Sequence, residues 1–209
     1  MHYLLRLDTH VFHLINRDWH AHWLDVVMPF ITNLHNTILQ NPPVFWFLIA
    51  LILIWILRGK AHAARAICAT ILAVGMADSF CTFIVKPIFK RPRPNSAHIG
   101  AILRTIRAIS YSFPSNHAAN SFAAASTIGF FYPWTRIFLL PYAAAVAYSR
   151  VYCGVHYPLD ILVGSIIGIC VSFLSARLVN QAADKIESWR QLFLQRAQAK
   201  RREKLTKGE

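Results

Sequence analysis

Long apolar blocks alternate along this chain with short polar stretches that are mostly basic. A helix needs about 20 predominantly apolar residues to cross a bilayer, with a range of about 17–25. Five blocks meet or approach this length, at residues 42–57, 63–85, 117–133, 134–152 and 157–179. The pattern therefore predicts an all-α fold, an integral membrane helical bundle with five transmembrane helices.

The segments on either side of these blocks are less apolar. Residues 1–41 are expected to form interfacial amphipathic helices, with Trp19 and Trp23 at headgroup depth. A short sixth span at residues 24–39 is the alternative, although Asp25 and Asn33 interrupt that run. Residues 42–180 would then form the transmembrane domain, and residues 181–209 a basic cytoplasmic tail. This tail is predicted either to lie on anionic lipid or to continue the last span into solvent.

Composition supports a membrane protein and argues against nucleic-acid binding. Of the 209 residues, 56% are hydrophobic and only 15% are charged, whereas a soluble domain has about 25% charged residues. The net charge of +13 is explained by basic loops that face anionic lipid, since no nucleic-acid-binding motif accompanies it. The four cysteines show no zinc-binding or CxxC spacing and are expected to be free.

Three polar motifs lie at the ends of the apolar blocks. They contain Lys86 with Arg93-Pro94, Pro114-Ser115-Asn116-His117, and Ser149-Arg150 with His156 and Asp160. Together they supply fixed cations, a helix start that can bind an anion, and a histidine with a carboxylate to orient it. Helices that alternate in direction place all three motifs on one face of the membrane. This combination of residues is what phosphoryl transfer through a phosphohistidine requires.

The opposite face is predicted to be cytoplasmic. Its loops contain Arg58, Lys60, Arg65 and Arg136, and the tail after Arg177 adds eight Lys or Arg residues. Cytoplasmic loops carry an excess of Lys and Arg, so the motifs are expected on the extracytoplasmic side of the cytoplasmic membrane.

The three motifs resemble the signature of the type 2 phosphatidic acid phosphatase family, which reads K-x6-R-P, P-S-G-H and S-R-x5-H-x3-D. Asn116 stands where the pattern has Gly. The resemblance implies a membrane enzyme that removes phosphate from lipid phosphates or diphosphates, with the lipid bilayer as its environment. No metal or other cofactor is implied, because no carboxylate cluster is present to hold magnesium.

Each matched residue can be given a role by this resemblance. His156 is the expected nucleophile, and Asp160, four residues later, would orient its imidazole. His117 would act first as general acid for the leaving group and then as base for water. The phosphate oxygens would be bound by Lys86, Arg93 and Arg150, and by the start of a helix at Ser115 and Asn116.

Some charged residues have no role in the motifs. Lys90, Arg91, Arg104 and Arg107 are expected to contact lipid headgroups, and no partner can be named for Asp78, which lies inside an apolar block.

Undecaprenyl diphosphate is the first expected substrate. Phosphatidylglycerol phosphate, phosphatidate and lipid A phosphate remain open, as does transfer of the phosphoryl group to another lipid. The alternative from a different class is a non-enzymatic membrane transporter.

Overall fold

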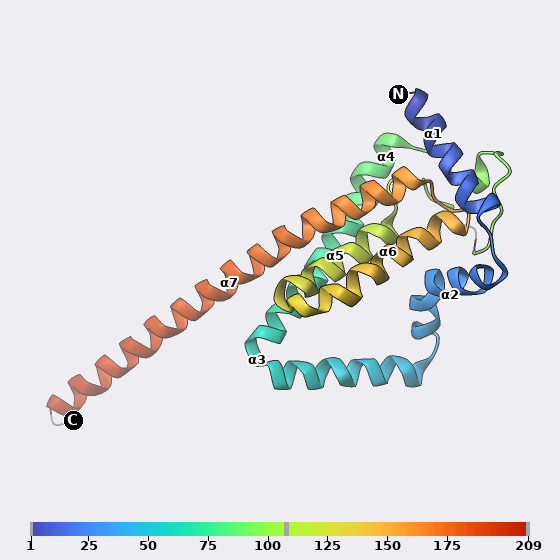
Figure 1. Ribbon diagram of the computed structural model, residues 1–209. Coiled ribbons are helices and arrows are strands. Elements are labelled where there is room, and N and C mark those ends of the chain that lie inside the picture. Colours follow the sequence, from blue (N-terminus) through green and yellow to red (C-terminus); the bar gives the residue numbers. More distant parts are fainter. Residues whose placement is uncertain (1, 107–108, 208–209) are drawn as a thin grey trace.

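The computed structural model describes residues 2–106 and 109–207, and the regular structure in these residues is entirely helical (Figure 1). The helices are α1 (His2–His13), η1 (Leu14–Asp18), α2 (His22–Leu39), α3 (Pro42–Ser79), η2 (Phe80–Val85), α4 (Lys86–Phe89), η3 (Pro94–Ser96), α5 (Asn116–Phe131), η4 (Pro133–Thr135), α6 (Arg136–Tyr152) and α7 (Pro158–Lys207). Proline begins α3, η4 and α7. It suits the first position of a helix, because an N–H there would have no hydrogen-bond partner within the helix.

Helix α5 is the centre of the bundle and packs against α3, α6 and α7. Most of its buried residues are small, including Ala118, Ala119 and Ala123. Gly164 and Gly168 of α7 face it so closely that a Cβ on Gly164 would lie 2.6 Å from the Ser115 carbonyl oxygen. Small residues on both helices therefore let the two backbones approach closely.

Three segments of the described chain are long and apolar enough to cross a membrane: Pro42–Gly59, Ala61–Ser96 and Pro158–Ala199. The structure confirms a helical protein with membrane-spanning segments but not the predicted number of five. The predicted blocks at 117–133 and 134–152 form α5 and α6, which have only 16 and 17 residues. At 1.5 Å per residue these helices are about 24–26 Å long, shorter than the about 30 Å hydrocarbon core.

Helix α3 includes two of the predicted blocks. It changes direction sharply between its first part and the part that joins the bundle (Figure 1). None of the Pro42–Gly59 window is buried, whereas 22% of the Ala61–Ser96 window is. The first part of α3 therefore lies apart from the bundle core.

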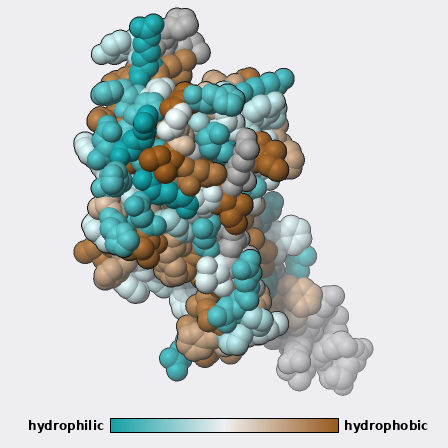
Figure 2. All heavy atoms as spheres, turned by 90° about the vertical axis from the view of Figure 1, so that its right-hand side faces the viewer, coloured by the Kyte–Doolittle hydropathy of each residue, from teal (hydrophilic) through white to brown (hydrophobic). Residues whose placement is uncertain are grey.

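The N-terminal segment is anchored to the end of the bundle that carries the motifs. Asn16 is fully buried and its amide nitrogen donates to the carbonyl oxygens of Ile102 (2.9 Å) and Tyr152 (2.8 Å). Arg104 makes an ion pair with Asp25 in α2, with 2.7 Å between Nε and Oδ1. Figure 2 shows this end of the molecule, where hydrophilic side chains gather over the upper part and hydrophobic ones lie among them.

Helix α7 continues without a break from the bundle through the basic tail (Figure 1). Of the two predicted arrangements of the tail, the continuous helix is the one observed. Ile186, Trp189 and Phe193 are exposed along it.

Candidate active site

The three sequence motifs meet at one end of the bundle. Their residues come from α4 and the chain after it, the start of α5, the end of α6, and the start of α7 with the residues just before it. Six of the eight predicted site residues are buried there: Lys86, Arg93, Ser115, Arg150, His156 and Asp160. Asn116 and His117 are half-buried.

His156 precedes α7, and Asp160 lies in the first turn of that helix. The imidazole Nδ1 lies 3.3 Å from Asp160 Oδ2. The backbone N–H of Tyr157 (2.9 Å) and the Ser112 hydroxyl donate to the same Oδ2 atom. The carboxylate is therefore fixed in place from several sides and accepts the Nδ1 proton of His156.

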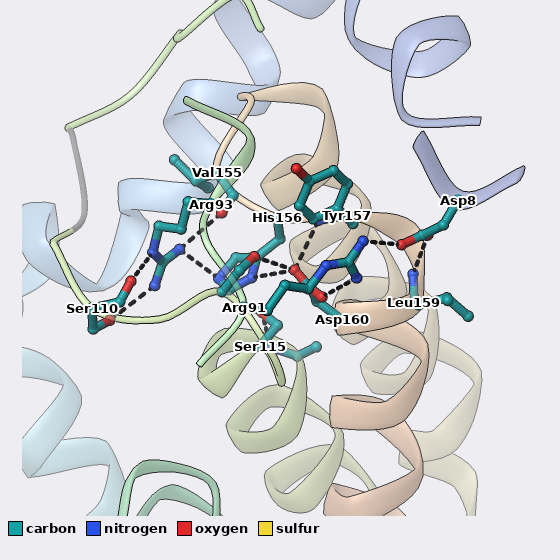
Figure 3. A network of polar contacts seen from close by, with 12 residues as sticks. Asp8, Arg91, Arg93, Ser110, Ser115, Val155, His156, Tyr157, Leu159 and Asp160 are labelled. Atoms are coloured by element: carbon teal, nitrogen blue, oxygen red, sulfur yellow. Dashed lines mark hydrogen bonds and ion pairs between the residues drawn. The ribbon is translucent and has the colours of Figure 1, made fainter. Parts of the chain in front are cut away.

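The other nitrogen of His156 faces Arg93. Arg93 Nη1 lies 2.9 Å from His156 Nε2 and also donates to the Val155 carbonyl oxygen at 2.9 Å (Figure 3). Because a guanidinium can only donate, Nε2 must present its lone pair. The two neighbours of His156 thus select the tautomer in which Nδ1 carries the proton and the lone pair of Nε2 accepts a hydrogen bond from Arg93.

Burial keeps this imidazole neutral. It lowers the pKa of His156 from 6.5 to about 4, while the hydrogen bond to Asp160 acts in the opposite direction and Arg93 and Arg150 add to the lowering. At neutral pH the Nε2 lone pair is therefore available without prior loss of a proton.

Arg150 and Lys86 add two more buried cations. Arg150 Nη1 donates to Thr32 Oγ1 of α2 at 2.5 Å, and its buried Nε has no hydrogen-bond partner among the described residues. Lys86 is close enough to interact electrostatically with Arg93 and Asp160. Three cations beside one neutral histidine form a site suited to an anion with several oxygens.

Ser115 caps the N-terminus of α5, and the Ala118 N–H points to its hydroxyl at 3.5 Å. The Ser115 N–H donates to the Asp160 carbonyl oxygen at 3.0 Å, which joins the second motif to the third. The start of α5 is thereby held beside the His156–Asp160 pair.

The residue that departs from the family pattern has a defined partner. The amide nitrogen of Asn116 donates to Asp78 Oδ1 (2.8 Å) and Thr82 Oγ1 (2.7 Å). Asn120 donates to the same Asp78 oxygen at 3.0 Å. Asp78, for which the sequence offered no partner, is thus bound by two amides, and the Asn116 side chain is directed at α3 and η2. The Asn116 side chain is therefore directed away from the predicted phosphate site, whereas its backbone N–H remains at the start of α5.

His117 lines a largely apolar cavity of about 440 Å³ between α2, α5 and α6. Thr32, which binds Arg150, lines the same cavity, together with Leu139, Tyr142 and Val146. The cavity therefore extends from the cation-rich site toward the apolar flank of the bundle.

Sequence reasoning missed several residues that contact the site. Arg91 was expected at lipid headgroups, but its guanidinium donates to Asp160 Oδ1 (2.8 Å) and to Asp8 Oδ2 of α1 (2.6 Å). Arg104 was also misassigned, since it pairs with Asp25. Lys90 is exposed, and Arg107 lies outside the described residues. The sequence alone does not pair Arg91 with Asp8 or Arg104 with Asp25, because about 80 positions separate the partners.

Histidine, cysteine, aspartate and glutamate side chains form no group of three able to hold a metal ion within residues 2–106 and 109–207. The four cysteines are free, as predicted.

These features define a helical membrane protein with a cation-rich site built around a neutral histidine. The sequence model of the PAP2 superfamily matches residues 64–184. The chain belongs to this superfamily.

Comparison with individual proteins gives the same family. The chain is 33% identical over 135 residues to the lipid A 4'-phosphatase of Bacteroides thetaiotaomicron, covering 60% of each protein. It is 44% identical over 69 residues to the undecaprenyl-diphosphatase of Sulfolobus acidocaldarius, covering 32% of this chain and 34% of that protein. The chain thus spans less than two thirds of these curated relatives. The crystal structure of Aquifex aeolicus LpxE is similar with a TM-score of 0.61 and 27% identity, over 82% of this chain and 95% of that one.

Proposed function

We propose that this protein is a membrane phosphatase that hydrolyses a lipid phosphate or diphosphate through a phosphohistidine at His156. The observation that carries the proposal is the environment of the imidazole. Asp160 holds the proton on Nδ1 at 3.3 Å, and Arg93 faces Nε2 at 2.9 Å. A buried neutral histidine with its lone pair among cations is prepared to attack a phosphorus atom.

In the first step, Nε2 of His156 forms a bond to phosphorus and the bond from phosphorus to the leaving oxygen breaks. His117 donates a proton to that oxygen. Arg93, Arg150 and Lys86 bind the three phosphoryl oxygens and stabilise the charge that shifts onto them. Asp160 stabilises the positive charge that the imidazole gains on forming the phosphorus–nitrogen bond.

In the second step, water attacks the phosphohistidine and gives a proton to His117. The phosphorus–nitrogen bond breaks, inorganic phosphate leaves, and the electron pair returns to Nε2. His117 thus ends the cycle protonated, as it began. Arg93 Nη1 contacts His156 Nε2 before substrate binds. When the substrate enters, the Arg93 N–H must therefore exchange its hydrogen bond to Nε2 for one to a phosphoryl oxygen.

Undecaprenyl diphosphate is the first proposed substrate, and an undecaprenyl-diphosphatase is among the relatives. Lipid A phosphate is the second, favoured by the similarity to a lipid A 4'-phosphatase over 60% of the chain. In either case the apolar cavity beside His117 is suited to the hydrocarbon part of the substrate next to the leaving oxygen. The site is proposed to face the extracytoplasmic side of the cytoplasmic membrane.

Phosphate release by the purified protein tests this function. The substrates are undecaprenyl diphosphate, lipid A, phosphatidylglycerol phosphate and phosphatidate, each assayed with excess chelator. We expect release from at least one lipid, undiminished by the chelator. Release that needs added magnesium would show that the three cations are not sufficient.

Two variants test the mechanism in the same assay. His156→Ala should abolish release, and Asp160→Asn should lower kcat by about 10²–10⁴, the scale seen when an orienting carboxylate is lost. His10→Ala, at an exposed position on α1, is the control and should retain activity. Activity of His156→Ala near that of the wild type would refute the phosphohistidine, and no release from any lipid would favour a transporter. A phosphorylated lipid formed from an added lipid alcohol would indicate phosphotransfer.

A further inference from the structure

Helix α1 contributes a buried carboxylate next to the predicted catalytic pair. Asp8 is 4% exposed, and its two oxygens are used differently. Oδ1 accepts the backbone N–H of Leu159 at 2.8 Å, and Oδ2 accepts Arg91 Nη2 at 2.6 Å. Leu159 is the second residue of α7, so Asp8 binds one of the N–H groups that have no partner within the helix.

Arg91 connects Asp8 to Asp160. Its Nη1 lies 2.8 Å from Asp160 Oδ1, while Nη2 binds Asp8 (Figure 3). The guanidinium also lies over the ring of Tyr157, with 3.8 Å between Cζ and the ring centroid. A planar group with a carboxylate at each end and an aromatic ring beneath it has little freedom to move.

The two oxygens of the Asp160 carboxylate therefore have different partners. Oδ2 faces His156 Nδ1 and also accepts the Tyr157 N–H and the Ser112 hydroxyl. Oδ1 is bound by Arg91. Arg91 therefore fixes the rotation of the carboxylate that places Oδ2 at His156, and Asp8 fixes Arg91.

We propose that Asp8 and Arg91 are positioning residues for the His156–Asp160 pair, so that α1 is a working part of the active site. Neither residue touches substrate in this proposal. It rests on the proposed function, in which His156 is the nucleophile and Asp160 orients it.

A purely structural role predicts a different result. If Asp8 and Arg91 only anchor α1, their loss lowers stability and leaves the kcat of the folded enzyme unchanged. Asp25 supplies a matched control, because it also anchors the N-terminal segment. It pairs with Arg104 at 2.7 Å and accepts the Tyr152 hydroxyl at 2.7 Å, and it makes no contact with Asp160.

The experiment compares kcat and KM of Asp8→Asn, Arg91→Gln and Asp25→Asn, each purified as folded protein and assayed on the lipid phosphate that the wild type hydrolyses. We expect Asp8→Asn and Arg91→Gln to lower kcat by about 10- to 100-fold, the scale found for residues that orient ligating histidines, with KM nearly unchanged. Asp25→Asn should keep the wild-type kcat. Arg91→Lys, which retains the charge but cannot bind both carboxylates in one plane, is the second variant at that position and should also lose kcat.

The double variant Asp8→Asn/Arg91→Gln separates a shared role from two independent ones. Because Asp8 acts through Arg91, the double variant should have a kcat no lower than Arg91→Gln alone. Wild-type kcat in Asp8→Asn and Arg91→Lys, or a loss in Asp25→Asn as large as theirs, would overturn the proposal. His156→Ala is assayed alongside: if it is active, the proposed function fails, and if it is inactive while the positioning variants keep full kcat, this inference alone fails.

Discussion

His156 experiences opposing influences on its charge. Burial and the nearby guanidinium groups of Arg93 and Arg150 disfavour the imidazolium, while the hydrogen bond to Asp160 favours it. The balance in the free protein is a pKa of about 4. In the proposed mechanism, a bound phosphate adds negative charge beside the cations, so the same imidazole can accept positive charge when the phosphorus–nitrogen bond forms.

The lowered pKa has a consequence for stability. Because His156 has a pKa of about 4 when folded and about 6.5 when unfolded, the unfolded state binds more protons between these values. The contribution of His156 to stability is therefore present above about pH 6.5 and lost as the pH falls toward 4. We expect the melting temperature of the wild type in detergent to fall relative to that of His156→Asn over this window. If the melting temperatures of the two proteins changed equally from pH 7 to pH 4, the burial of a neutral imidazole would be contradicted.

At the scale of residues, the sequence predicted residues that lie together in the structure, but it did not predict their surroundings. His156, Asp160 and the cations were identifiable because they belong to three ordered motifs with defined internal spacings, which lie at the ends of apolar blocks. Arg91 and Arg104 carry the same charge in the same loop, and only the fold shows that Asp8 and Asp25 lie opposite them. A pairing between residues about 80 positions apart leaves no local pattern to detect.

At the scale of elements, the contact between α5 and α7 determines where the site forms. A Cβ on Gly168 would collide with the Ala119 carbonyl oxygen and lie 2.9 Å from the Ala123 N–H. The same pair of helices brings Ser115 to the Asp160 carbonyl oxygen at 3.0 Å. The distance between the second and third motifs therefore depends on glycine in α7.

Gly168→Ala tests this contact. We expect it to reduce the free energy of unfolding by about 1–3 kcal/mol, the usual effect of overpacking a tight interface, and to lower activity by shifting α7 against α5. Gly75→Ala in α3 is the matched control, because among the described residues no atom outside the adjacent backbone of α3 lies within 4 Å of its added Cβ. The control should be neutral or stabilising, by up to about 1 kcal/mol, since alanine favours helix. Unfolding in mixed detergent micelles measures both, and equal effects would contradict the close contact.

Hydropathy gave the positions of the helices better than their boundaries. The basic residues between the first two predicted blocks do not end the helix, because Arg and Lys are good helix formers, and α3 runs from Pro42 to Ser79. In contrast, α5 and α6 are shorter than their blocks, since the separate short helix η4, which begins at Pro133, lies between them. Apolar composition reports burial in either lipid or protein, so it could not establish how many helices cross the bilayer.

At the scale of the whole molecule, the site and the tail lie at opposite ends of α7 (Figure 1). Asp160 is in the first turn of this helix, and the basic residues occupy its far end. If the first half of α7 spans the bilayer, the two ends must be on different sides. The excess of Lys and Arg then favours the proposed orientation, with the tail in the cytoplasm.

Thiol labelling tests this topology. Ser96→Cys lies near the site and Ser188→Cys on the tail, and both positions are exposed. Each is introduced into a protein in which Cys68, Cys81, Cys153 and Cys170 are replaced by alanine. On intact cells, a membrane-impermeant reagent should label position 96, and position 188 only after the membrane is opened. The reverse pattern would invert the proposed orientation and exclude a substrate presented on the outer leaflet.

Because α7 is one continuous helix, it also limits the electrostatic interaction between the basic tail and the lipid surface. At 1.5 Å per residue, Arg196 lies about 27 Å along the helix beyond residue 178, where about 20 residues have crossed the hydrocarbon. Ions in physiological solution screen charge over about 8 Å, so this distance is more than three screening lengths. If the first half of α7 spans the bilayer and the helix follows the bilayer normal, the positive charge at the far end of α7 is electrostatically separate from the lipid surface and adds little to membrane binding.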